Sequence, residues 1–256
     1  MFPYRDENET QRTPYVTLAV IALNVFAWLF VQGAGSTFAL AESVCNLGLI
    51  PGELTLAAAP GTSFPMGEGL VCVTDPGRQV TNLLTSMFLH GSWMHLLGNM
   101  WFFWIFGNNV EDSMGHGRFG AFYLICGLLA AAAQIAANPS SNTPMVGASG
   151  AISGIMGAYL LLFPHVRVFT LVFLGFFMTT IALPAWVMLL YWMAIQFFGG
   201  LQSMGASGGV AFWAHIGGFA AGLALIKLFV RPDYLRQHKS HHWRPRHEGF
   251  DRSRWN

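Results

Sequence analysis

Long uncharged stretches of apolar residues recur along this sequence and restrict what it can fold into. A helix that crosses the hydrocarbon of a bilayer needs about 20 mainly apolar residues. Charged residues make up only 10% of the chain, against about 25% in average soluble domains. The stretches predict six transmembrane helices, at residues 14–31, 81–110, 119–137, 149–163, 185–198 and 210–230. We therefore expect an all-α membrane protein.

The remaining segments complete the predicted organisation. Residues 1–13 mix acidic and basic side chains ahead of an apolar stretch too long for a signal-peptide core, so we interpret them as a cytoplasmic N-terminal tail. Residues 14–230 form the predicted membrane domain, and within it residues 32–78 are a long outer loop rich in Gly and Pro. Residues 231–256 are basic, and we expect this cytoplasmic C-terminal tail to be largely disordered.

One apolar stretch, residues 168–201, is too long for a single crossing helix. Pro184 lies within it, and proline interrupts a helix because it lacks the backbone N–H and clashes with the preceding turn. The sequence therefore predicts an interfacial segment before Pro184 and the fifth transmembrane helix after it.

The distribution of positive charge predicts the orientation. Lys and Arg collect on the cytoplasmic side of membrane proteins. With a cytoplasmic amino terminus, all of the 13 Lys and Arg residues except Arg78 fall inside. Both termini are then cytoplasmic, and the second, fourth and sixth helices enter from the outer face. The few basic residues give no indication of nucleic-acid binding. We expect those of the C-terminal tail to lie near anionic lipid head groups.

Two polar residues lie at bilayer depth, where polar groups are costly and usually functional. Ser149 stands in the first turn of the fourth predicted helix and His215 about five residues into the sixth. At about 1.5 Å per residue, both belong to the outer part of the bilayer. A serine hydroxyl becomes a nucleophile when a base removes its proton. No Asp or Glu lies at this depth of the second, fourth or sixth helix, so we predict a Ser149–His215 dyad.

Other residues are candidates for stabilising an oxyanion. Gly147 permits unusual backbone conformations, and the helix that begins at Ser149 directs free N–H groups to the place where an oxyanion would form. His95 and Asn99 are four residues apart, so they share a helix face and could add donors. His90 precedes His95 by five residues, which turns it about 140° away on an ideal helix, and it is the weaker candidate.

Small residues predict where the fourth and sixth helices meet. Gly218 and Gly222 lie one and two turns beyond His215, and small residues at this spacing let helices approach closely in membranes. Ser149, Ser153 and Gly157 have the same spacing on the fourth helix and are the expected partners.

Four motifs, in order along the chain, make the sequence resemble the rhomboid family of intramembrane serine proteases over residues 14–230. They are HGSWMHLLGN at 90–99, EDSMGHGRF at 111–119, GASG at 147–150, and AHIGG at 214–218 with Gly222. The resemblance implies a bundle of six transmembrane helices with a long first outer loop. It also implies a serine endopeptidase without cofactor or metal, whose substrates are transmembrane proteins. For location, it implies a multi-pass protein of the bacterial inner membrane.

The resemblance also bears on single residues. Gly150 is implied to be structural, and so are Glu111 and Arg118, which lie near the inner interface and would form an ion pair or a helix cap. The chain departs from the family in two places. The Trp-Arg pair that many bacterial members carry in the first outer loop is absent, and Ser153 stands where well-studied members have an aromatic residue that stacks on the base.

The cysteines leave two alternatives open. Cys45 and Cys72 both fall in the outer loop, where an oxidising compartment permits a disulfide, while Cys126 lies in the third predicted helix. The loop contains either this disulfide or two free thiols.

Three other functions compete with proteolysis by a serine. An inactive rhomboid-like protein that binds membrane clients is the first, although such relatives generally lack the Ser or the His. A b-type cytochrome with His95 and His215 as axial ligands is the second. A metalloprotease is disfavoured because His90 and His95 lack the HExxH spacing.

Overall fold

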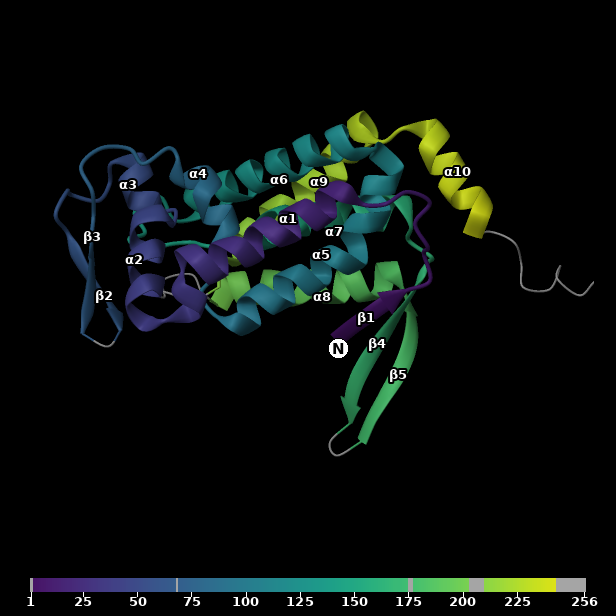
Figure 1. Ribbon diagram of the computed structural model, residues 1–256, viewed down its shortest axis with the longest axis horizontal. Helices are drawn as coiled ribbons and strands as arrows, with labels where there is room; N and C mark the ends of the chain where they lie inside the picture. The colour runs from purple at the N-terminus through teal and green to yellow at the C-terminus, as the bar shows by residue number, and fades with distance from the viewer. Residues whose placement is uncertain (1, 68, 175–176, 203–209, 243–256) are drawn as a thin grey trace, which may run out of the picture.

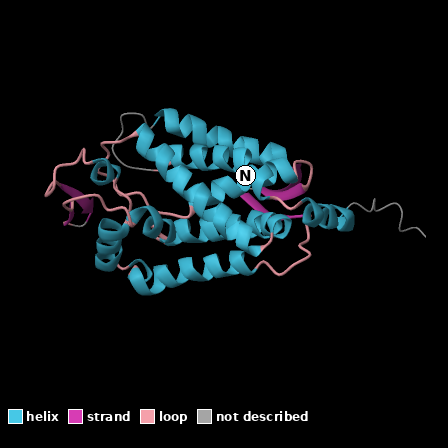
Figure 2. Ribbon diagram, turned by 90° about the horizontal axis from the view of Figure 1, so that it is seen from above, coloured by secondary structure: helices cyan, strands magenta, loops and turns pink. Residues whose placement is uncertain are grey.

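Six of the helices pack side by side along the long axis of the molecule (Figures 1 and 2). The computed structural model describes residues 2–67, 69–174, 177–202 and 210–242. The six helices are α1 (Tyr15–Phe26), α5 (Trp93–Met114), α6 (His116–Ala137), α7 (Ser149–Leu162), α8 (Ala185–Gln202) and α9 (Phe212–Phe229). α7 is the core of this bundle, because every residue from 150 to 159 is buried.

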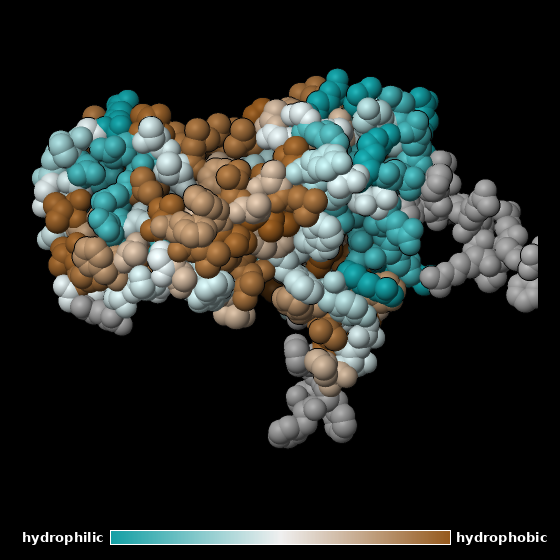
Figure 3. All heavy atoms as spheres, in the orientation of Figure 1, coloured by the Kyte–Doolittle hydropathy of each residue, from teal (hydrophilic) through white to brown (hydrophobic). Residues whose placement is uncertain are grey.

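The lengths and surface of the helices are those of a membrane protein. α6, α8 and α9 are long and apolar enough to cross a bilayer, and α7 and the segment Tyr15–Val31 are shorter apolar helices. In Figure 3, apolar residues cover the middle of one face, and hydrophilic residues gather at the end that carries α10. The chain is thus a mainly helical membrane protein, as predicted. That it crosses the membrane six times stays a prediction.

The segment predicted as the second transmembrane helix is broken near its start. It contains α4 (Asn82–Thr85), a 3-10 turn (Ser86–Phe88) and, after a gap, α5. Ser92 accounts for the new helix start: it is the N-cap residue of α5, and its Oγ accepts a hydrogen bond from the backbone N–H of His95 at 3.1 Å. His90 therefore precedes α5, and the predicted helical angle between His90 and His95 is wrong.

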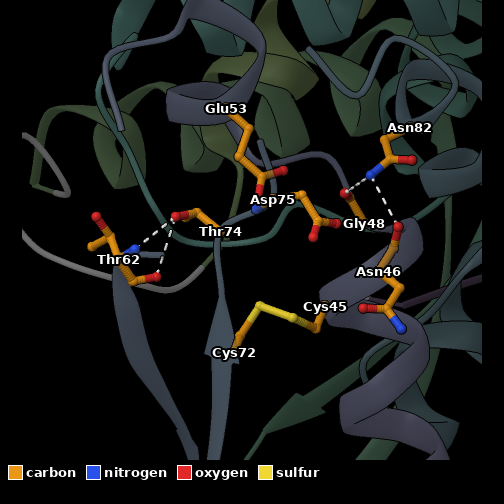
Figure 4. Close-up of a disulfide and its surroundings, with 9 residues drawn as sticks. All are labelled: Cys45, Asn46, Gly48, Glu53, Thr62, Cys72, Thr74, Asp75 and Asn82. Carbon is orange, nitrogen blue, oxygen red and sulfur yellow. Dashed lines mark hydrogen bonds between the residues drawn. A yellow bond between two sulfur atoms is a disulfide. The ribbon is translucent and has the colours of Figure 1, made fainter. Parts of the chain in front are cut away.

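The outer loop is folded and docked on the bundle. It contains α2 (Thr37–Leu47), α3 (Pro51–Thr55) and the hairpin of β2 (Ser63–Gly67) and β3 (Leu70–Val73). Of the two alternatives for its cysteines, the structure forms the disulfide, which joins α2 to β3 with the Cα atoms of Cys45 and Cys72 5.6 Å apart (Figure 4). Asn82 Nδ2 donates to the carbonyl of Gly48 at 2.9 Å and so ties the loop to α4.

A small sheet stands at the opposite end of the bundle. It consists of β1 (Phe2–Asp6), β4 (Arg167–Leu174) and β5 (Phe177–Pro184), antiparallel in the order β1-β4-β5. The predicted interfacial segment is therefore a β-hairpin, with β-branched and aromatic residues that favour strands. Pro184 does divide it from the following helix, because α8 begins at Ala185.

The C-terminal tail begins with a helix. α10 (Pro232–His242) follows α9, so the prediction of disorder is wrong for these residues, while residues 243–256 lie outside the described part. Tertiary contacts stabilise the helix. His238 is buried, with Nδ1 2.6 Å from Asp112 Oδ2 and Nε2 2.8 Å from Asn8 Oδ1.

Candidate active site

The helix starts of α7 and α9 bring a serine and a histidine together. Ser149 is the first residue of α7, and His215 lies in the first turn of α9. Ser149 Oγ and His215 Nε2 are 2.7 Å apart, which is hydrogen-bond distance. The other ring nitrogen, Nδ1, lies 2.7 Å from Oε1 of Gln196 in α8. Because an amide oxygen only accepts hydrogen bonds, Nδ1 carries the proton and Nε2 accepts from the serine hydroxyl.

Glycines allow the two helices to approach this closely. A Cβ atom on Gly218 would overlap the carbonyl oxygen of Gly150, and one on Gly222 would overlap that of Gly154. The predicted contact of Gly218 and Gly222 with α7 is thus present, but their partners are Gly150 and Gly154 in place of Ser149 and Ser153. Gly157, the third predicted partner, does pack against α9, because a Cβ atom on it would overlap the carbonyl oxygen of Phe219. Ser153 instead donates its hydroxyl to the carbonyl of Ser149 at 2.7 Å.

Gly147 adopts a backbone conformation that suits glycine and opens space beside Ser149. Its φ is +127°, and a Cβ atom there would lie 2.8 Å from His95 Nε2. Its N–H donates to the carbonyl of Ser86 at 2.8 Å, which fixes the turn into α7. No side chain caps α7, so the helix directs its first N–H groups at the space next to Ser149.

Two side chains of α5 aim donors at the same place. His95 Nδ1 accepts a hydrogen bond from the N–H of Gly91 at 3.3 Å, so its proton lies on Nε2, the atom that faces Gly147. Asn99 Nδ2 is buried and has no hydrogen-bond partner within the described residues. A buried donor without a partner is costly, and an incoming oxyanion would satisfy this one.

His90 does not reach the serine. It is fully buried, its ring centroid lies 5.1 Å from that of His95, and its backbone exchanges two hydrogen bonds with the side chain of Gln32. It therefore packs behind His95, and no contact links it to Ser149 in the described part of the chain.

The serine and histidine open into a cavity of about 670 Å³. Its lining includes His95, Asn99, Ser149, Trp192, Gln196 and His215. α5, α7, α8 and α9 all contribute residues to the lining, so the cavity lies inside the bundle. Met145 of the lining forms a β-bridge with Leu49 of the outer loop, so the cavity lies near the end of the bundle that carries this loop.

A comparison with protein families matches residues 77–232 to a Rhomboid domain. The chain belongs to the rhomboid family.

Curated relatives agree with this assignment. RHOMBOID-like protein 4 of Arabidopsis thaliana is 32% identical over 62% of this rhomboid and 36% of its own length. RHOMBOID-like protein 1 of the same plant is 26% identical over 86% of the chain and 55% of its own length. Rhomboid protease GluP of Bacillus subtilis is 41% identical over 30% of the chain and 15% of its own length. This rhomboid therefore spans about half, or less, of the length of these relatives.

Glu111 and Arg118 of this rhomboid lie far from the serine and contact different helix ends. Glu111 accepts hydrogen bonds from the N–H groups of Val16 and Thr17 at 2.9 and 2.8 Å, which caps the start of α1. Arg118 donates to the carbonyl of Phe229 at 3.3 Å, at the end of α9. The sequence predicted either an ion pair or a helix cap for these two residues, and each of them makes a contact that caps a helix end.

Sequence reasoning missed two residues of α8. Trp192 lies beside His215, with the two ring centroids 5.7 Å apart, and Gln196 contacts the imidazole of His215 directly. A signal for Gln196 existed, because it is the only amide or charged side chain among residues 185–198. Trp192 had no comparable signal, because aromatic residues are common throughout the chain.

Proposed function

We propose that this rhomboid is a serine endopeptidase that hydrolyses peptide bonds in or next to the transmembrane segments of other membrane proteins. The observation that carries the proposal is the 2.7 Å contact between Ser149 Oγ and His215 Nε2 inside a cavity. A hydroxyl at hydrogen-bond distance from an unprotonated imidazole nitrogen is an activated nucleophile.

The reaction follows from this geometry. His215 Nε2 takes the proton of Ser149 as Oγ attacks the scissile carbonyl, and it then gives the proton to the leaving amine. The N–H groups at the start of α7, His95 Nε2 and Asn99 Nδ2 stabilise the negative oxygen of the tetrahedral intermediate. A water molecule, deprotonated by the same histidine, then hydrolyses the acyl-enzyme. No metal or organic cofactor takes part.

The resemblance to rhomboid proteases implies the substrate class, and the site's position near one end of a membrane bundle supports it. A peptide bond within a transmembrane helix is shielded, because its N–H and C=O groups are bonded inside the helix. Substrates are therefore segments with helix-destabilising residues near the outer membrane surface. In this proposal both termini are cytoplasmic, the chain crosses the membrane six times, and the protein resides in a bacterial inner membrane.

Labelling with a fluorophosphonate in detergent tests the proposal. The probe reacts with activated serines, so the wild type is expected to be labelled, while Ser149→Ala and His215→Ala are not. Ser153→Ala is the matched control, because this serine is one turn away on the same helix and its hydroxyl bonds only a backbone carbonyl in the described structure. Undiminished labelling of Ser149→Ala would exclude Ser149 as the nucleophile. Absence of labelling and of cleavage in the wild type would favour an inactive, client-binding protein.

A further inference from the structure

The contact between Gln196 and His215 gives the dyad a third member. We propose that Gln196 is a positioning residue that holds His215 in the tautomer able to accept the proton of Ser149. The proposal rests on the proposed function and adds a residue that acts through the base. Gln196 is 7% exposed and lies on α8, whereas Ser149 and His215 lie on α7 and α9, so three helices meet at the imidazole.

The hydrogen bond to Gln196 determines which ring nitrogen of His215 carries the proton. A neutral imidazole carries one N–H, and either ring nitrogen can hold it. With the proton on Nε2, the ring would present a donor to Ser149 and could not act as a base. Gln196 Oε1 lies 2.7 Å from Nδ1 and can only accept, so the proton stays on Nδ1. The lone pair of Nε2 then faces Ser149 Oγ.

The same bond contributes during the reaction. When Nε2 takes the serine proton, the ring becomes a cation in a buried site, where an unpaired charge is expensive. Its Nδ1–H then donates a charge-assisted hydrogen bond to Gln196 Oε1, which is stronger than the neutral one. Because the amide carries no charge, it stabilises the imidazolium less than a carboxylate would.

No other residue supplies this function in the described part of the chain. The only hydrogen bond of His215 Nδ1 there is the one to Gln196. Ser153, on the helix that carries the nucleophile, has its hydroxyl bonded to the carbonyl of Ser149 and offers no ring surface to the base. Trp192 supplies such a surface from α8, one turn before Gln196. Both groups that hold the imidazole beside the nucleophile therefore come from α8.

The position of α8 is set by close packing against α9. A Cβ atom on Gly199 would lie 2.4 to 2.9 Å from ring atoms of Phe212, and one on Gly200 would lie 3.4 Å from its Cβ. These glycines let the end of α8 approach the start of α9, one turn from Gln196 and His215. A hydrogen bond of 2.7 Å weakens steeply when its partners separate by about an ångström, so the base is held in this tautomer only while α8 packs here.

Kinetics of full-length variants in detergent test the proposal. Gln196→Met keeps the length of the side chain but removes the acceptor, and kcat is expected to fall about 10-fold or more, the worth of one buried hydrogen bond. Gln196→Glu is expected to retain activity and to move the acid limb of the pH profile of kcat/KM to higher pH, because a carboxylate stabilises the protonated ring. Gln202→Met is the control, since it removes an exposed amide from the same helix.

Nitrogen-15 spectra of histidine-labelled protein give a readout independent of turnover. Comparison with His215→Ala assigns the His215 signals. In the wild type Nδ1 is expected to be protonated, and in Gln196→Met part of the population is expected to carry the proton on Nε2. Wild-type kcat, pH profile and tautomer in a folded Gln196→Met variant would overturn the proposal. If the wild type has no Ser149-dependent turnover, the proposed function fails, and the tautomer shift still decides the role of Gln196.

Discussion

At the scale of single residues, the site is a set of donors and acceptors with fixed directions. His215 meets an acceptor on one nitrogen and a donor on the other. His95 is fixed in the opposite sense, because its Nδ1 accepts from Gly91 and its Nε2 is the donor. In the proposed mechanism one histidine is thus the base and the other an oxyanion ligand, and the difference comes entirely from their neighbours.

Asn99 provides a test of this arrangement. Asn99→Ala removes a buried donor that has no partner among the described residues, and loss of one oxyanion donor typically lowers kcat by about 100-fold or more. Steady-state cleavage of a transmembrane reporter peptide measures the effect. The unfolding temperature is expected to stay the same or rise, because an unsatisfied buried group is removed. An unchanged kcat would exclude Asn99 from the oxyanion site.

The residues of the site differ in how far the sequence could predict them. Ser149 and His215 stand out because each is a polar residue in an apolar stretch. His90 was misplaced because one serine, Ser92, caps α5 and starts the helix later than the hydrophobic pattern indicates. Gln196 is also a polar residue in an apolar stretch, but its partner was not predictable, because its role depends on how α8 packs against α9 and hydrophobicity along the chain does not contain that information.

At the scale of elements, the contact between α7 and α9 holds the nucleophile and the base together. The sequence correctly indicated Gly218 and Gly222 as the contact face of α9. On α7 it correctly indicated Gly157, but it indicated Ser149 and Ser153 where the structure uses the neighbouring residues Gly150 and Gly154. The physical reason is that α7 is buried on all sides over residues 150–159. A helix without a lipid-facing or solvent-facing side has no amphipathic pattern, so the pattern cannot predict which face of the helix contacts another helix.

Substitution at this contact should separate the dyad. Gly218→Leu places a side chain where the carbonyl of Gly150 lies, so the helices must move apart and Ser149 Oγ must leave hydrogen-bond distance of His215. Activity and fluorophosphonate labelling are expected to fall by more than about 10-fold, before the fold is lost. Gly117→Ala is the control, because no atom lies within 4 Å of the added Cβ. Full turnover in Gly218→Leu would contradict this packing.

At the scale of the whole molecule, the N-terminal segment and α10 meet at the end of the bundle opposite the serine. His238 bonds Asp112 and Asn8, which are 126 and 230 residues away in sequence. The neighbouring β1 adds a further contact, because Tyr159 at the far end of α7 donates its hydroxyl to Asp6 at 2.6 Å. Such distant pairings leave no local pattern, which is why the sequence predicted only a polar N-terminal tail and a disordered C-terminal tail here.

The burial of Asp6 makes the stability of the protein dependent on pH. Burial raises the pKa of Asp6 to about 7, above the value of about 3.9 in an unfolded chain. Between these two values the folded protein keeps a proton that the unfolded chain has released. The free energy of unfolding therefore declines as the pH rises from about 4 to about 7, by at most about 4 kcal/mol, and is level above that range.

Thermal unfolding of the full chain in detergent, measured between pH 5 and pH 8, checks this expectation. Asp6→Asn should remove most of this decline in the free energy of unfolding. It should also be more stable than the wild type at pH 8, since the amide stays neutral and can still accept the hydrogen bond from Tyr159. Glu7→Gln is the matched control, because Glu7 is the adjacent carboxylate and faces Arg167 at 3.9 Å without contacting Tyr159. The free energy of unfolding of Glu7→Gln should decline with pH as that of the wild type does. Equal pH dependence in Asp6→Asn and the wild type would show that another group titrates. β1 and α10 would then be held to the bundle independently of the Asp6 proton.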